Sequence, residues 1–93
     1  MRMYIFRLYV AGESLNSARA LTNLKALCAQ YLSGSHRIEI VDVLKKPQQA
    51  LAAGVIVTPT LVKVAPLPSQ QVIGDLGAQS QVLLVLGLQE RTA

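Results

Sequence analysis

The segment Val55–Val64, VIVTPTLVKV, decides the fold, because a Thr–Pro step separates two apolar runs rich in β-branched residues. Proline has no N–H group to donate to a sheet ladder, so Pro59 is expected at the first residue of a strand or at a sheet edge. The segment therefore predicts a strand over Thr60–Val64 that begins directly after Pro59.

The residues on either side of this strand predict a hairpin and a short helix. Downstream, the turn APLPS contains Pro66 and Pro68, which prevent further pairing, and Gln70–Ile73 can form a short edge strand. Upstream, Pro47 suits the first position of a short helix and Gly54 suits its end.

The N-terminal half predicts a strand, a long helix and a second strand. Met3–Val10 is apolar on both faces except for one arginine, as expected of a central strand. A helix is expected over Asn16–Leu32, capped by Ser14 or by Asn16 itself. Arg37–Val43 reads as the second strand, so this half forms a parallel β-α-β unit.

The last segment, Gln79–Leu88, is apolar without a clean helical period, and either a helix or a strand fits its composition. We expect a helix with Val82, Leu83 and Leu86 facing inward. The full order is then βαβαββα, the order of the thioredoxin-like α/β fold, in a single domain over residues 1–93.

The composition limits the classes of partner. The 93 residues carry a net charge of +4, but the basic residues are scattered and only Lys45 and Lys46 are adjacent, so no nucleic-acid interface is expected. The longest apolar run near the C-terminus, VLLVLGL, is far too short to span a membrane, and the first ten residues do not resemble a secretion signal. We expect a cytoplasmic protein, and so small a core favours a homo-oligomer.

The residues that redox, metal or acid–base chemistry would need are not gathered in the sequence. The start of the long helix, where a thioredoxin carries its thiolate, holds Ser14, Asn16 and Ser17 but no cysteine. The one cysteine, Cys28, is expected to be a buried small hydrophobe, and His36 to be solvated in a loop. We therefore expect no enzyme activity and no cofactor; a thiol-dependent redox protein that uses Cys28 is the enzymatic alternative.

Four blocks carry a resemblance to a known family: LYVAGESLNSARAL (Leu8–Leu21), VDVLKKPQQA (Val41–Ala50), TPTLVKVAPLP (Thr58–Pro68) and VIGDL (Val72–Leu76). In this order and spacing they closely resemble the KaiB family of circadian clock proteins. The resemblance runs from Tyr4 to about Leu86.

The resemblance implies a docking protein with a thioredoxin-like frame and no redox pair. Members of this family bind the N-terminal ATPase ring of KaiC and modulate its phosphorylation cycle; the assembly recruits KaiA and displaces a competing sensor histidine kinase. The family is also metamorphic, so the alternative fold is a ground-state form, in a dimer or tetramer, with a rearranged C-terminal half.

The matching blocks also supply candidate residues. Arg19 and Lys63 carry over as contacts to an acidic face of the ATPase ring, and Lys25 is added from its expected exposure on the same helix as Arg19; ordinary solubilising charges are the alternative interpretation. Three further residues of the blocks are expected to be structural, namely Pro59, Gly74 and Asp75.

The chain departs from the family pattern at a few positions. Gln70 and Gln71 stand where clock members often have a basic pair, and Val85 replaces a glycine. A divergent paralogue, or a KaiB homologue that acts in a stress response with another protein partner, is therefore the alternative to a full clock protein.

Overall fold

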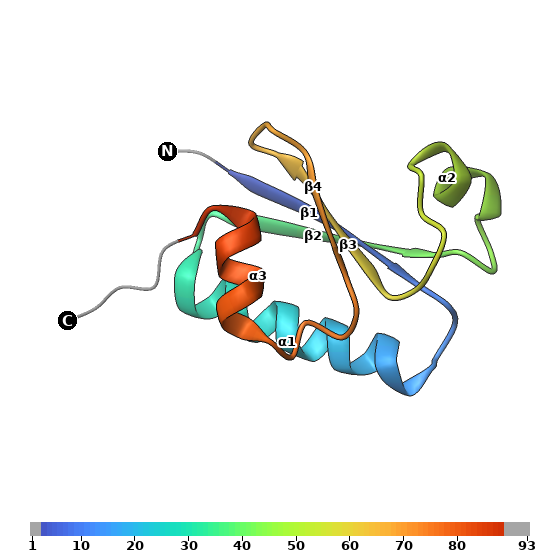
Figure 1. The fold of residues 1–93 in the computed structure, drawn as a ribbon, viewed down its shortest axis with the longest axis horizontal. Coiled ribbons are helices and arrows are strands. Elements are labelled where there is room, and N and C mark those ends of the chain that lie inside the picture. The colour runs from blue at the N-terminus through green and yellow to red at the C-terminus, as the bar shows by residue number, and fades with distance from the viewer. Residues whose placement is uncertain (1–2, 89–93) are drawn as a thin grey trace.

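A computed structural model describes residues 3–88, which form a four-stranded sheet with three helices (Figure 1). The elements follow the predicted order βαβαββα, and their bounds lie within two residues of the predicted ones. They are β1 Tyr4–Val10, α1 Leu15–Tyr31, β2 His36–Asp42, α2 Pro47–Ala52, β3 Thr60–Ala65, β4 Gln70–Ile73 and α3 Gln79–Leu86.

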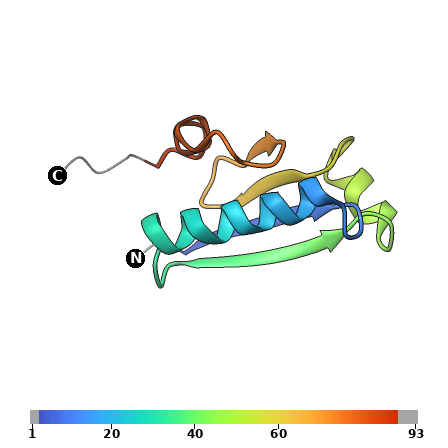
Figure 2. The same ribbon diagram turned by 90° about the horizontal axis from the view of Figure 1, so that it is seen from below.

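The sheet has the strand order β2-β1-β3-β4, so β1 lies between the two halves of the chain. β1 pairs with β2 in parallel and with β3 antiparallel, and β3 pairs with β4 as the predicted hairpin. The parallel pair is connected through α1, which runs along the sheet (Figure 2).

The two faces of the sheet are covered unequally. Helices α1 and α3 lie on the same side of the sheet (Figure 1), and the larger apolar cluster, which includes Phe6, Leu8, Leu24 and Leu86, fills the space between. On the other face a smaller cluster packs Tyr9 and neighbouring valines against α2. Because α2 has only six residues, it covers only one end of that face.

Pro59 stands directly before the first residue of β3, as its missing N–H group predicts. It is buried, its peptide bond with Thr58 is cis, and its carbonyl accepts a hydrogen bond of 3.0 Å from the N–H of Gly74. The Thr60 hydroxyl donates to the carbonyl of Val57 at 2.6 Å. The bond to Gly74 attaches the approach to β3 to the end of β4, and the Thr60 bond holds the turn before β3.

The ambiguous last segment is a helix. Its side chains Val82, Leu83 and Leu86 are 1–3 % exposed, which is the inward set that the sequence predicts. Leu84 points away and is 81 % exposed. The helix ends at Gly87, whose left-handed φ of 74° is a conformation that glycine adopts without a steric penalty. The C-terminal half therefore has the thioredoxin-like arrangement rather than the rearranged one.

Replacing Leu86 by alanine tests this packing. We expect L86A to lower the free energy of unfolding by about 2–5 kcal/mol, because it leaves a cavity between α3 and the sheet. The matched control L84A removes the same atoms from an exposed site and should change it by less than about 0.5 kcal/mol. Urea titrations of both variants measure the difference, and equal losses would contradict the packing of α3.

Candidate functional site

Two serines that hydrogen-bond to each other occupy the start of α1, where a thioredoxin carries its thiolate. Ser14 is the N-cap, the first of the two predicted candidates, and its Oγ accepts from the N–H of Ser17 at 3.2 Å. The Ser14 hydroxyl also donates to Ser17 Oγ at 2.8 Å, and Ser17 Oγ accepts from the N–H of Ala11 at 3.3 Å. Both serines are therefore used in capping.

Cys28 lies in the interior of α1 and its side chain is fully buried, as the sequence predicts. Burial raises the pKa of its thiol from the ordinary 9.0 to about 11, because the apolar surroundings disfavour the thiolate. A thiolate is the form that attacks a disulfide or a peroxide, so this environment argues against the redox alternative.

The raised pKa of Cys28 predicts a loss of stability in alkali. The unfolded chain releases the thiol proton at lower pH than the folded chain, so the contribution is complete below about pH 9 and is lost as the pH rises toward 11. We expect a loss on the order of 2 kcal/mol between these limits. Urea titrations across this range should show the loss in the native protein and a smaller one in C28A. Identical pH profiles would contradict it.

His36 differs from its prediction. It is the first residue of β2 rather than a solvated loop residue, it is half-buried, and its Nδ1 lies 2.9 Å from the carbonyl oxygen of Leu32. The end of α1 and the start of β2 are close enough for the ring to bridge them, which spacing alone does not reveal.

Over residues 3–88 no three His, Cys, Asp or Glu side chains gather as a metal site would require. No helix within the same residues is long and apolar enough to cross a membrane.

The three predicted partner contacts do not form one patch. Arg19 and Lys25 are exposed on α1, as expected, but they are six positions apart, which separates them by about 120° around the helix axis. Lys63 differs from its prediction as a surface charge, because the residue is only 5 % exposed. It pairs with Phe6 in β1 and with Gln70 in β4, so its side chain lies on the sheet face that carries the larger core.

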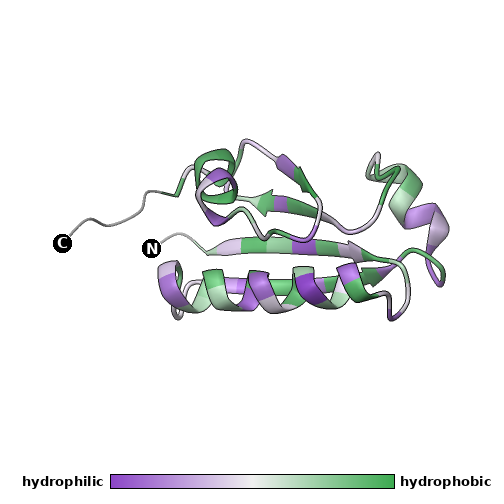
Figure 3. Cartoon of the chain, turned by 60° about the horizontal axis from the view of Figure 1, so that its bottom comes forward, coloured by the Kyte–Doolittle hydropathy of each residue, from purple (hydrophilic) through white to green (hydrophobic). Residues whose placement is uncertain are grey.

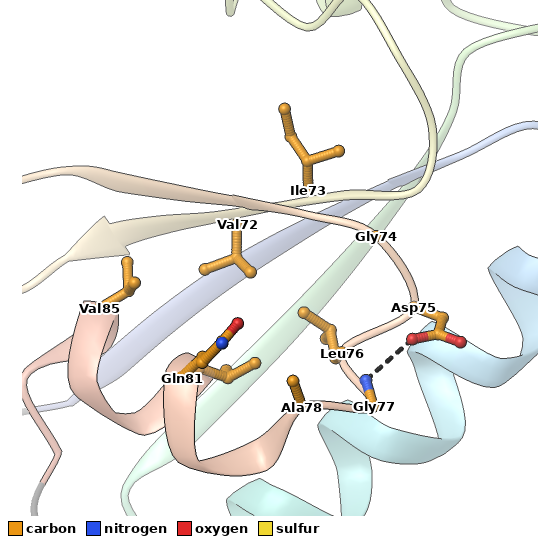
Figure 4. A pocket seen from close by; sticks show the side chains of 10 residues that line it. Val72, Ile73, Gly74, Asp75, Leu76, Gly77, Ala78, Gln81 and Val85 are labelled. Atoms are coloured by element: carbon orange, nitrogen blue, oxygen red, sulfur yellow. Dashed lines mark hydrogen bonds between the residues drawn. The ribbon is translucent and has the colours of Figure 1, made fainter.

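Gly74 and Asp75 form the bend between β4 and α3 (Figure 4). Gly74 has a φ of 113°, which side chains rarely allow, and Asp75 Oδ1 accepts from the N–H of Gly77 at 2.9 Å. The carbonyl of Asp75 accepts from Asn23 Nδ2 in α1 at 2.8 Å. These bonds fix the entry to α3 and support the structural role expected of both residues.

A cavity of about 190 Å³ lies between this bend, β4 and α3 (Figure 4). Val72, Leu76 and Val85 point toward it, whereas Ile73 points to the other side of the strand. Its lining is mostly hydrocarbon; the polar side chains are Gln81 and Asp75, and Asp75 Oδ1 already accepts from the N–H of Gly77. It has room for an aliphatic group but offers no set of groups that would orient a polar substrate.

The feature that sequence reasoning missed is a set of exposed apolar side chains around α2. Leu44, Leu51 and Ile56 are 72 %, 75 % and 94 % exposed, and Val57 is also exposed. Lys45 and Lys46 are exposed in the turn that leads into the helix. We call these six residues the α2 surface. Figure 3 shows the mixed character of this end of the molecule, where α2 has a hydrophilic start and a hydrophobic end.

Exposed apolar side chains with charged neighbours are typical of protein interaction sites. The sequence contained a signal, because Pro47 and Gly54 limit the helix to about two turns while apolar residues stand before, within and after it. In the structure Ala50 is the one buried residue of α2. Leu51 within α2 and Ile56 after it are left largely exposed to solvent.

Comparison with known proteins assigns the family. The KaiB domain matches residues 7–88. The chain is 44 % identical to the circadian clock oscillator protein KaiB of Gloeothece citriformis, over 94 % of this chain and 82 % of the relative. It is 45 % identical to the KaiB of Synechococcus elongatus, over 94 % and 85 %. The chain belongs to the KaiB family. Family membership supports a role as a clock protein.

Solved structures confirm the predicted thioredoxin-like fold. The N-terminal domain of Synechococcus elongatus SasA matches all of this KaiB-family chain and 91 % of its own, with a TM-score of 0.77 and 26 % identity. Mitochondrial thioredoxin 3 from Saccharomyces cerevisiae matches 95 % of this chain and 81 % of its own, with a TM-score of 0.73. At 18 % identity the thioredoxin shares the fold alone.

Proposed function

We propose that this protein is a non-enzymatic clock component that binds a KaiC-like ATPase ring through the α2 surface and modulates the phosphorylation cycle of that ATPase. The observation that carries the proposal is the exposure of Leu51 and Ile56, in and just after α2, in a chain of the KaiB family. The relatives are named clock oscillator proteins, and the thiol environment gives no support to redox catalysis.

The chemistry of the α2 surface defines the complementary partner. Four of its six residues are aliphatic, and burying one Leu or Ile side chain contributes about 1.5–3 kcal/mol. The other two are Lys45 and Lys46, so an apolar partner patch beside acidic groups fits best. Arg19 and Lys25 remain in the proposal as exposed charges that assist association from α1.

Further partners belong to the same proposal. The likeness of the whole chain to the N-terminal domain of SasA supports competition between the two proteins for one surface of the ATPase. Recruitment of KaiA to the assembly, and a homo-oligomer in the absence of the ATPase, complete the proposed cycle. We place this cycle in the cytoplasm, where a chain with one buried cysteine needs no disulfide.

Fold switching of the C-terminal half is also proposed, and two polar residues with little exposure support it. Lys63 is almost fully buried, and the neighbouring Gln70 has a buried Oε1 without a hydrogen-bond partner among the described residues. Buried polar groups lower the stability of the arrangement that contains them. We propose that the rearranged half exposes both side chains, which would make Lys63 available to a partner.

The substitution Lys63→Met tests whether Lys63 lowers the stability of this arrangement, because methionine keeps most of the length of the side chain and removes the ammonium group. We expect K63M to raise the free energy of unfolding by about 1 kcal/mol or more. The matched control K25M, at an exposed position of α1, should change it by less than about 0.5 kcal/mol. Urea titrations compare the two variants; destabilisation by K63M would show that the buried lysine is favourable where it lies.

Binding to the ATPase is tested with the purified chain and a KaiC homologue, incubated for hours to days so that slow steps are complete. Gel filtration at low and moderate salt should show co-elution. We expect I56D to weaken binding by at least about tenfold, because it replaces the most exposed aliphatic side chain of the α2 surface by a charged one. The matched control L84D, at an exposed position of α3, should bind like the native chain. Absence of binding by the native chain after long incubation would refute the proposal.

A further inference from the structure

Asp42, the last residue of β2, accepts four hydrogen bonds from the backbone around it. Its Oδ1 accepts from the N–H of Gly12 at 3.1 Å and from the N–H of Leu44 at 2.9 Å. Its carbonyl oxygen accepts from the N–H groups of Lys45 at 3.0 Å and Lys46 at 2.9 Å. Three of these four donors belong to residues of the α2 surface.

The bond to Gly12 joins two loops that are far apart in the sequence. Gly12 lies in the loop after β1, and Leu44 lies in the turn after β2; the two loops meet because parallel strands end at the same edge of a sheet. The loops also touch, since a Cβ atom added to Gly12 would lie 3.5 Å from Leu44 Cδ1. Gly12 has a φ of 59°, so its N–H is directed at Asp42 by a backbone conformation that favours glycine.

We infer that Asp42 is the positioning residue of the α2 surface: its side chain attaches the turn that presents Leu44, Lys45 and Lys46 to the rigid end of the β1–β2 pair. This inference rests on the proposed docking role of that surface. Without the side-chain acceptor, the turn between β2 and α2 would lose its one side-chain bond to the β1 loop and one of the bonds that set its shape. The backbone that carries the two lysines and the leucine would then be less ordered. Ordering it on binding would cost conformational entropy and lower the affinity for the partner.

The effect of the position of Asp42 Oδ1 can be separated from the effect of the negative charge on the side chain. Both side-chain bonds end on the same oxygen, Oδ1, so the amide oxygen of asparagine can accept them without a negative charge. Glutamate keeps the charge but moves the oxygen by one methylene group. If Asp42 acts by position, D42N should therefore retain its function and D42E should not.

The test measures backbone hydrogen exchange and affinity for the KaiC homologue in D42N, D42E and D42A. In D42E and D42A we expect the N–H groups of Gly12 and Leu44 to exchange about tenfold faster, and affinity to fall by a similar factor, for the loss of about one hydrogen bond. Exchange at the central strand residue Leu8 should stay within about twofold of the native rate, which separates a local effect from unfolding. D42N should match the native chain within about twofold in both measurements.

Several results would overturn the inference. One is native affinity in D42E despite faster exchange in the turn; another is unchanged exchange at Gly12 and Leu44 in both D42E and D42A. Loss of affinity in D42N, with its exchange unchanged, would assign the effect to charge instead. If D42A does not fold, the comparison of D42E with D42N still decides. If the native chain itself binds no ATPase, the proposed function fails, while the exchange measurements still test whether Asp42 orders the turn.

Discussion

The structure depends on the position of β1 between β2 and β3. This strand hydrogen-bonds on both edges, and it is the one strand that joins the parallel N-terminal unit to the C-terminal hairpin. Its side chains alternate between the two clusters, with Phe6 and Leu8 under α1 and α3 and Tyr9 under α2; all three are fully buried. A strand with this apolar pattern on both faces has no stable place at a sheet edge, so the rest of the chain is arranged around it.

The α2 surface follows from the same arrangement. The larger cluster is covered by a 17-residue helix and a further helix of eight residues, whereas the other face has only the six residues of α2. So short a helix has too few side chains to cover both the sheet and its own flanking segments. The aliphatic residues in and beside it therefore remain in contact with water. A partner that covered them would gain roughly 25 cal/mol of binding free energy for every Å² of apolar surface that it buries. The free energy that the fold does not gain there is available to association.

The sequence predicted the elements better than it predicted which side chains were exposed. The strand after Pro59 and the order of elements followed from hydrophobic periodicity and from the lack of a proline N–H, which are local signals. The inward side of α3 was also predicted correctly, although its helical period is weak. The burial of Lys63 could not be predicted, because it depends on pairing with Phe6, more than fifty positions away. The bond between Asp42 and Gly12, thirty positions apart, could not be predicted for the same reason. The contact of His36 with Leu32 spans only four positions, but it depends on how the chain turns between α1 and β2.

The start of α1 explains why the thioredoxin-like frame of this protein lacks the environment for thiol–disulfide exchange. In a redox enzyme that helix terminus stabilises a thiolate, because its free N–H groups and the helix dipole favour negative charge. Here the Ser14 hydroxyl occupies the N-cap, Ser17 bonds to it, and the single cysteine lies in the core with a raised pKa. The same edge of the sheet, where β1 and β2 end, is instead joined by Asp42 to the turn that leads into α2. The frame thus retains the rigid edge on which thioredoxins place chemistry, and in this chain that edge holds an apolar and basic surface.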